Sequence, residues 1–217
     1  MRGFDAWHHR VMTTGGPEGR GVEHRGNVAG LLLAAGSGSR LGRPKALVEL
    51  GGERLVDRGV RTLGEGGCAC VTVVLGAADT AVDGAVTVHN PDWPTGMGSS
   101  VRAGIDALPD TVDAVLVALA DQPLVTSEAV RRLVEAFEQG ARAAVATYKG
   151  NPRNPVMLGR EHWSTVYSMA ERDVGARPFL RAYSHLVTSI PCDDVASPED
   201  IDTVEDLARL SEVLDRA

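Results

Sequence analysis

A glycine-rich stretch near the start of the chain carries two cations at a spacing suited to phosphate chemistry. Its residues are Leu33, Ala34, Ala35, Gly36, Ser37, Gly38, Ser39, Arg40, Leu41, Gly42, Arg43, Pro44 and Lys45. Glycine lets backbone N–H groups approach an anion closely, and Arg40 and Lys45 add charge-assisted hydrogen bonds to phosphoryl oxygens. The stretch predicts a nucleotide phosphate loop, and the alternative is a solvated loop with two surface cations.

Two common phosphate loops fit this stretch poorly. A Walker loop needs four residues between its first glycine and its Gly-Lys pair, whereas three separate Gly38 from Gly42. The dinucleotide fingerprint needs a glycine where Leu41 stands, and Pro44 keeps the segment extended. A nicotinamide-binding oxidoreductase is therefore a minor alternative, which a lack of NAD binding would exclude.

Carboxylates later in the chain supply candidate metal ligands. Asp121 directly follows the apolar run 115–120, and a carboxylate at the end of a buried strand is costly unless something binds it. Magnesium normally uses one or two carboxylates together with substrate phosphates. The sequence predicts Mg²⁺ at Asp121, with Asp202 as the second ligand and Asp200 as a weaker candidate. Alternatively, Asp121 is a turn residue and the other two stabilise a helix N-terminus.

Strand and helix patterns alternate along the chain. We expect strands over 28–34, 70–75, 85–89, 114–119, 143–147 and 186–190, and helices over 54–63, 98–108, 127–139 and 203–214. Ser127 and Gly140 are expected to bound the third helix, and Thr203 with Asp206 to form a capping box. These repeats predict an α/β, Rossmann-like, mostly parallel sheet with helices on both faces, and ligands at the carboxyl ends of its strands.

Composition excludes several classes of protein. The 217 residues carry a net charge of −7 and 43% hydrophobic residues, which favours one domain over 28–217 and no extended nucleic-acid binding. The longest apolar runs are too short for a membrane span. Residues 1–27 are polar, contain three of the six histidines and are expected to be a flexible tail. The three cysteines suggest reduced thiols, and we expect a cytoplasmic location.

The glycine stretch resembles the signature L-A-[AG]-G-x-G-x-R-x-G-x-x-K of nucleotidyltransferases that act on sugar phosphates and molybdopterin. Further segments, in the same order, resemble motifs of the molybdenum cofactor cytidylyltransferase branch of the NTP-transferase family: residues 90–104, 121–123, 173–177 and 200–207. The resemblance covers roughly residues 27–214. It implies a fold of the nucleotide-diphospho-sugar transferase type.

The resemblance also implies an activity: Mg²⁺-dependent transfer of CMP from CTP to the phosphate of molybdopterin or its molybdenum-loaded form, with release of pyrophosphate. Lys45 would act on the transition state, Arg40 on the leaving pyrophosphate, and Asp121 would be the third catalytic residue. Gly96, Ser99 and Ser100 would join the glycine stretch in binding the nucleotide, and Ala35 would narrow the base pocket. Asn154, Asp173 and Arg177 would lie on the acceptor side. Transient contact with a molybdoenzyme or its chaperone is a further expectation.

One segment departs from the family's pattern on the expected acceptor side. The family shows Gly-x-Pro-Gly-His-Pro, where this chain has Gly150, Asn151, Pro152, Arg153, Asn154 and Pro155. Asn154 can hydrogen-bond in place of histidine but cannot act as an acid or base, and Arg153 adds a charge. The acceptor therefore stays open, as do GTP in place of CTP, a sugar phosphate or phospholactate acceptor, and a non-catalytic molybdenum-cofactor chaperone.

Overall fold

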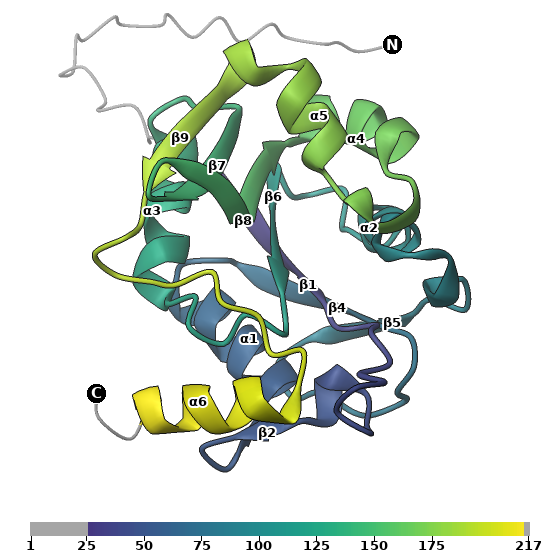
Figure 1. The fold of residues 1–217 in the computed structure, drawn as a ribbon. Coiled ribbons are helices and arrows are strands. Elements are labelled where there is room, and N and C mark those ends of the chain that lie inside the picture. The colour runs from purple at the N-terminus through teal and green to yellow at the C-terminus, as the bar shows by residue number, and fades with distance from the viewer. Residues whose placement is uncertain (1–25, 215–217) are drawn as a thin grey trace, which may run out of the picture.

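The computed structural model describes residues 26–214 and is built on one seven-stranded sheet (Figure 1). The strands are β1 (Val28–Leu33), β4 (Cys70–Leu75), β5 (Val86–His89), β6 (Ala114–Leu119), β7 (Ala143–Tyr148), β8 (Asn151–Gly159) and β9 (Val187–Pro191). Their order across the sheet is β5-β4-β1-β6-β8-β7-β9. Only β8 is antiparallel to its neighbours in this sheet. A separate hairpin pairs β2 (Glu49–Leu50) with β3 (Glu53–Arg54).

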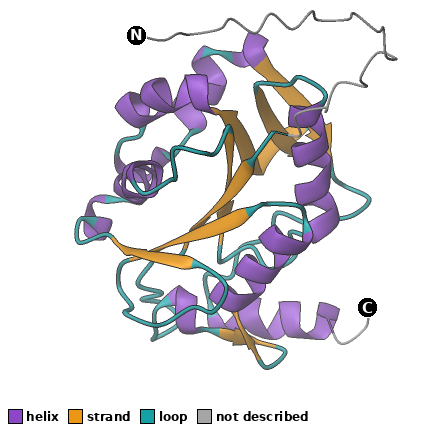
Figure 2. Ribbon diagram, turned by 180° about the vertical axis from the view of Figure 1, so that it is seen from behind, coloured by secondary structure: helices purple, strands orange, loops and turns teal. Residues whose placement is uncertain are grey.

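Helices cover both faces of the sheet, as Figures 1 and 2 show. Helices α1 (Leu55–Glu65) and α3 (Ser127–Glu138) pack on one face. The other face carries α2 (Met97–Asp106), α4 (Trp163–Met169) and α5 (Arg177–Ala182). Helix α6 (Val204–Leu214) lies beside β2 instead. Short 3₁₀ turns occur at Lys45–Leu47, Trp93–Thr95, Arg160–His162, Arg172–Val174 and Ser184–Leu186.

Strand β1 shows why the chain folds into three layers. All six of its residues are buried, and successive side chains of a strand point to opposite faces. Leu32 therefore packs with α1 and α3, whereas Leu31 and Leu33 pack with the helices of the other face. The continuous apolar run of a strand covered on both faces produces the predicted Rossmann-like α/β fold.

The carboxyl ends of the central strands lie at one edge of the sheet. Leu33 at the end of β1 pairs in register with Leu119 at the end of β6, and the Ala120 amide donates to the Leu33 carbonyl at 3.1 Å. The Asn90 amide, which follows β5, donates to the carbonyl of Leu75 at 2.8 Å. Segments widely separated in sequence therefore meet at the edge where a ligand was expected.

All of the predicted strands and helices are present, with small shifts at their ends, but the short strands β2 and β3, strand β8, and helices α4 and α5 were missed. Strand β8 contains Pro152 and Pro155, and proline residues argue against a strand when only the sequence is known. It tolerates them beside a break in the β7–β8 register between Val145 and Ala146. Helices α4 and α5 have seven and six residues, too short for a clear helical period.

The two predicted helix caps had different outcomes. The capping box of α6 is confirmed, because the Thr203 amide donates to Asp206 at 3.0 Å and the Asp206 amide donates to the Thr203 hydroxyl at 3.1 Å. The prediction that Ser127 caps α3 is wrong. Thr126 is the N-cap residue, and its hydroxyl accepts from the Ala129 amide at 3.3 Å and donates to the Val195 carbonyl at 3.0 Å. The second bond holds the helix start to the C-terminal segment.

The expected tail lies outside the described residues except for its last two positions. The side chain of Asn27 donates to the Thr111 carbonyl at 3.1 Å, and its amide donates to Asp113 at 2.8 Å. Across residues 26–214, no helix combines the length and apolar character needed to cross a membrane.

Replacing the observed cap of α3 should be more damaging than replacing the predicted one. Thr126→Ala removes both hydroxyl bonds and should lower the free energy of unfolding by about 1 kcal/mol. Ser127→Ala is the matched control and should change it by less than about 0.5 kcal/mol. Urea unfolding of both variants measures the difference, and equal effects would contradict the cap assignment.

Candidate functional site

Two carboxylates and one ammonium group meet at the carboxyl edge of the sheet. The Nζ atom of Lys45 lies 2.6 Å from Oδ2 of Asp121 and 2.5 Å from Oδ1 of Asp202. The Lys45 and Asp121 side chains are 18% and 20% exposed, whereas that of Asp202 is 46% exposed. Three residues that are far apart in sequence thus form one partly buried ion cluster, which we call the Lys45 triad.

The glycine loop reverses the direction of the chain after β1 and brings Lys45 back beside Gly36. Gly38 has a φ of +57°, and a Cβ atom there would lie 2.0 Å from the carbonyl oxygen of Arg43. Only glycine fits this position without moving the backbone. The Lys45 amide donates to the Gly36 carbonyl at 3.1 Å, which closes the loop.

Backbone pairing holds Asp121 and Asp202 side by side. The amide of Ile201, a fully buried residue, donates to the Asp121 carbonyl at 2.8 Å. The Gln122 side chain donates to Oδ1 of Asp200 at 2.9 Å. These contacts join the segment before α6 to the end of β6, and the position of Asp202 follows from them.

The environment of the triad shifts the pKa of Lys45. Burial alone would lower the pKa of this ammonium, but the charge of Asp121 and hydrogen bonds to Asp121 and Asp202 outweigh burial and raise it. Lys45 is therefore a fixed cation at neutral pH. Desolvation raises the pKa of the neighbouring Asp200 carboxyl, against the opposing hydrogen bond from Gln122.

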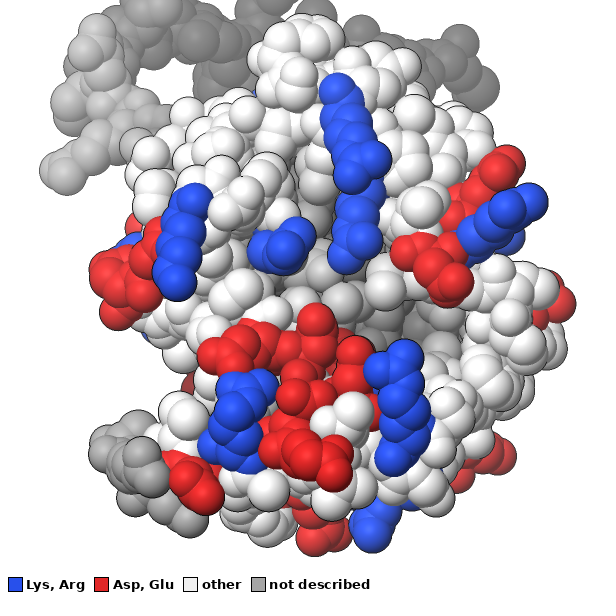
Figure 3. Space-filling view, viewed as in Figure 1, with Lys and Arg blue, Asp and Glu red and all other residues white. Residues whose placement is uncertain are grey.

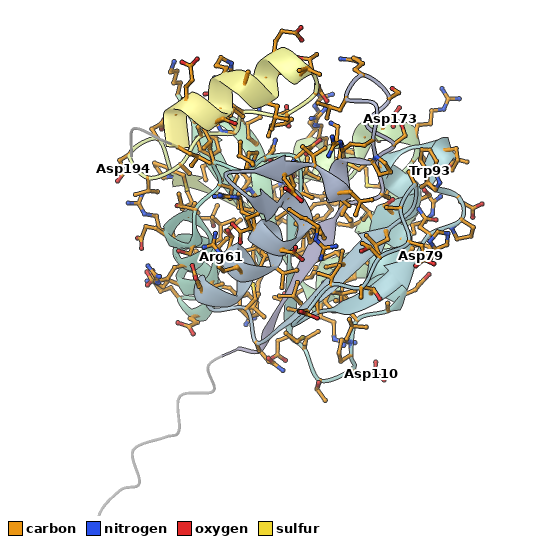
Figure 4. The ribbon with its side chains drawn as sticks, turned by 90° about the horizontal axis from the view of Figure 1, so that it is seen from below. Arg61, Asp79, Trp93, Asp110, Asp173 and Asp194 are labelled. Atoms are coloured by element: carbon orange, nitrogen blue, oxygen red, sulfur yellow. The ribbon has the colours of Figure 1, made fainter. Side chains whose placement is uncertain are left out.

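A first cavity of about 340 Å³ opens beside the triad. Its lining residues come from the ends of β1 and β6, the loop before α2, and Asp173: Leu33, Ala34, Ala35, Gly36, Ser37, Lys45, Trp93, Pro94, Gly96, Met97, Ser100, Leu119, Ala120, Asp121 and Asp173. Trp93 and Asp173 lie on the same side of the molecule in Figure 4. The cavity combines an aromatic wall, small side chains and one cation, which suits a heterocyclic base joined to a phosphate chain.

A second cavity of about 440 Å³ adjoins the first, since Met97, Leu119 and Asp121 line both. Asp200 and Asp202 also line it, together with residues of β8 and α5 that include Arg153, Asn154 and Arg177. In the view of Figure 3, this face is hollowed across its middle, with carboxylates gathered below the hollow and basic side chains above it. The site therefore has two compartments that meet at Asp121.

A buried asparagine organises the loop between β5 and α2. Asn90 is 3% exposed; its side-chain amide donates to the hydroxyls of Ser99 and Ser100 at 2.8 and 3.0 Å. Its side-chain carbonyl accepts from the Asp92 amide at 3.0 Å. Asn90 thereby fixes the turn that carries Trp93 into the first cavity.

The structure gathers most, but not all, of the predicted site residues. Those predicted to bind the nucleotide that line the first cavity are Leu33, Ala34, Ala35, Gly36, Lys45, Gly96, Ser100 and Asp121. Gly38, Arg40 and Ser99 line neither cavity. Arg40 is exposed, and the Ser99 hydroxyl bonds the carbonyls of Asp92 and Gly96 at 2.9 Å.

The three residues expected on the acceptor side are divided between the cavities. Asn154 and Arg177 line the second cavity, whereas Asp173 lines the first. Oδ1 of Asp173 accepts weakly from the Met97 amide at 3.4 Å, at the start of α2. Apolar lining residues such as Val156 and Leu180 were not foreseen; Leu180 had no signal because α5 was not predicted.

The donor atoms of the triad fit a divalent cation. Two carboxylate oxygens already converge on one positive group, and hard cations such as Mg²⁺ and Mn²⁺ prefer oxygen ligands. Within residues 26–214 no cluster of three or more His, Cys, Asp or Glu side chains has a metal-binding arrangement. A cation at this place would therefore rest on Asp121 and Asp202 and take its other ligands from water or substrate.

A mostly parallel sheet with a glycine loop, a fixed lysine and two carboxylates at its carboxyl edge defines a nucleotidyltransferase-type α/β protein. The sequence agrees: residues 30–187 match the MobA-like NTP transferase domain family, and the chain belongs to that family.

The names of similar proteins indicate different activities. Nicotine blue oxidoreductase of Paenarthrobacter nicotinovorans is 42% identical over 197 residues, which cover 84% of this chain and 96% of the relative. The 2-C-methyl-D-erythritol 4-phosphate cytidylyltransferase of Streptomyces avermitilis is 34% identical over 130 residues, covering 54% of this chain and 52% of the relative.

Solved structures share the fold. The Rv0371c homologue from Mycobacterium sp. strain JC1 superposes with a TM-score of 0.77 at 29% identity, covering 88% of this chain and 98% of the other. A manganese complex of Rv0371c from Mycobacterium tuberculosis H37Rv has a TM-score of 0.72 at 23% identity, covering 86% and 98%. At this identity the second likeness supports the fold alone.

Asn90 should be important for stability although it lines neither cavity. Asn90→Ala leaves the Asp92 amide and two serine hydroxyls without their partner and should lower the free energy of unfolding by about 1–3 kcal/mol. Asp92→Ala is the control, because Asp92 joins this network through its backbone atoms. Denaturant unfolding compares them, and equal losses would refute the role of the Asn90 side chain.

Proposed function

We propose that this protein is a divalent-metal-dependent nucleotidyltransferase that moves CMP from CTP to the phosphate of molybdopterin or its molybdenum-loaded form and releases pyrophosphate. The observation that carries the proposal is the Lys45 triad at the junction of two cavities. A transfer between two substrates needs two adjacent compartments with compensating charge where they meet. The first cavity would hold the nucleotide and the second the acceptor.

In this proposal the protein works by positioning and electrostatics. The acceptor phosphate attacks the α-phosphorus of CTP in line, and pyrophosphate leaves from the opposite side. The attacking phosphate is already ionised, so no general base is required. Lys45 presents a fixed positive charge where negative charge increases during the attack. The exposed Arg40 would meet the leaving pyrophosphate. Mg²⁺ held by Asp121 and Asp202 would neutralise phosphate charge.

We attribute the preference for CTP to the residues that form the wall of the first cavity. Ala34 and Ala35 are buried and line the cavity, and the methyl group of Ala35 would narrow the space for the base. A Cβ atom at Gly76 would lie 2.6 Å from Trp93 and 2.8 Å from Ala35, so both of these lining residues pack against the Gly76 backbone. A narrower pocket would favour a pyrimidine over a purine, with modest discrimination from a single methyl group.

The proposal extends to location and partners. Cys68, Cys70 and Cys192 are free thiols, as suits the reducing cytoplasm. A dinucleotide cofactor made here would pass to a molybdoenzyme or its chaperone through transient contact.

An oxidoreductase is the second candidate function. It is favoured by the 42% identity to nicotine blue oxidoreductase over 84% of this chain. The first cavity, with Trp93 and Met97 in its wall, would then hold a flat heterocyclic substrate or cofactor. Spectroscopic titration with NADH and NADPH, and reduction of nicotine blue, separates this candidate from nucleotidyl transfer.

Cytidylyl transfer should depend on Asp121. Purified protein, Mg²⁺, molybdopterin and either CTP or GTP are mixed, and pyrophosphate and dinucleotide are followed. We expect product with CTP, and a loss of about 100-fold or more in Asp121→Asn because the residue is placed at the meeting point of both cavities. Asp79→Asn, at an exposed aspartate outside both cavities, is the control.

Each alternative has its own result in this assay. Product with GTP alone would move the activity to guanylyl transfer. Molybdopterin binding without turnover would favour a cofactor chaperone. Nucleotide binding without product would show that the acceptor is different, and nicotine blue reduction without nucleotide turnover would favour the second candidate.

Removing the Lys45 ammonium should strengthen metal binding to the nucleotide-free protein. In Lys45→Met the carboxylates of Asp121 and Asp202 lose their internal cation, so we expect Mn²⁺ affinity to rise about tenfold. Electron paramagnetic resonance of free Mn²⁺ measures the affinity. Arg43→Met loses the same charge from the same loop and should have little effect. Unchanged or weaker binding in Lys45→Met would argue against a metal site at these carboxylates.

A further inference from the structure

Two arginines that line the second cavity have no anionic partner among the residues that the structure describes. Arg153 and Arg177 both line it, and within residues 26–214 neither side chain makes an ion pair or hydrogen bond. Several arginines elsewhere are paired with a carboxylate of the protein. Arg61 pairs with Glu53 and Arg132 with Asp194, at 2.9 and 2.7 Å. The guanidinium groups of Arg153 and Arg177 are therefore available to a ligand in this cavity.

The negative and the positive side chains that line the second cavity come from different elements of the fold. Its three carboxylates, Asp121, Asp200 and Asp202, come from the end of β6 and the segment before α6. Its two arginines come from β8 and α5. Apolar side chains of Val156, Val174 and Leu180 also line the cavity. A matching ligand has an uncharged body and negative groups directed to the arginines.

Arg177 and Arg153 occupy different places relative to the reacting centre. The segment before Arg177 adjoins the junction of the cavities, because a Cβ atom at Gly175 would lie 3.0 Å from the sulfur of Met97, which lines both. Arg153 instead pairs in register with Ala146 of β7, on the far side of β8 from β6. We therefore assign Arg177 to the reacting phosphate, and Arg153 reaches the cavity from a different element, β8.

We infer that the acceptor carries a second negatively charged group in addition to its reacting phosphate, and that Arg153 selects for this group. A guanidinium fork binds a carboxylate or phosphate through two parallel hydrogen bonds, so two separate forks match two separate anions. The inference rests on the proposed function in treating the second cavity as the acceptor side. It does not depend on which nucleotide occupies the first cavity.

A matched pair of small phosphates tests the inference. 3-Phosphoglycerate and glycerol 3-phosphate both carry a phosphate, and only the first has a carboxylate. Isothermal titration at low salt should show about tenfold tighter binding of 3-phosphoglycerate to the wild-type protein. Arg153→Gln should bring this ratio close to one without weakening glycerol 3-phosphate. Arg177→Gln should weaken both probes.

Arg181→Gln is the control, because Arg181 lies on α5 but does not line the cavity. Equal binding of both probes to the wild type, no binding of either, or an unchanged ratio in Arg153→Gln would overturn the inference. Pyrophosphate release from CTP distinguishes its failure from that of the proposed function. Pyrophosphate release without a difference in binding between the two probes would overturn only the inference. Discrimination without nucleotide binding overturns only the proposed function.

Discussion

The attraction between one ammonium group and two carboxylates is the interaction on which the rest of the site depends. Lys45, Asp121 and Asp202 come from three distant segments, and each would be poorly tolerated in this partly buried place alone. Together they offset part of one another's charge, because the ammonium balances one of the two carboxylates. Their cluster marks where the two cavities meet, so the same contact that stabilises the carboxyl edge also defines where a reaction would occur.

The fold keeps this cluster in place through contacts remote from it. Ile201 is fully buried beside Leu210 of α6, and its backbone bond to Asp121 fixes the carboxylate that follows it. Gly38 bends the loop that returns Lys45, and Asn90 holds the opposite wall of the first cavity. Each of these residues helps to fix the geometry of the site and is not assigned to bind a ligand. Such support is what a preorganised site requires.

The sequence allowed prediction of elements and residues whose signal is local. The ion pairs of Lys45 with Asp121 and Asp202 were not predicted, because the sequence assigned Lys45 to phosphate and the carboxylates to a metal. The strands before Gly36 and Asp121 are long apolar runs, and parallel strands bring their carboxyl ends together, so the meeting of the glycine loop with these carboxylates followed from topology. The division into two cavities did not, because it depends on β8 and α5, whose prolines and short length hide them. Two further features depend on tertiary structure and have no local sequence pattern. Asp173 and Asn154 line different cavities, and the Ser99 hydroxyl bonds to backbone carbonyls of the protein.

The antiparallel course of β8 has a consequence for how the specificity of such a site changes over evolutionary time. Because β8 begins at the carboxyl edge, Pro152 and Arg153 are paired with Thr147 and Ala146 of β7 rather than lying in a free loop. Inserting or deleting one residue in the paired part of β8 beyond the register break would exchange the two faces of the strand and disturb the core around Met157. New acceptors would therefore arise by substitution at a few strand positions.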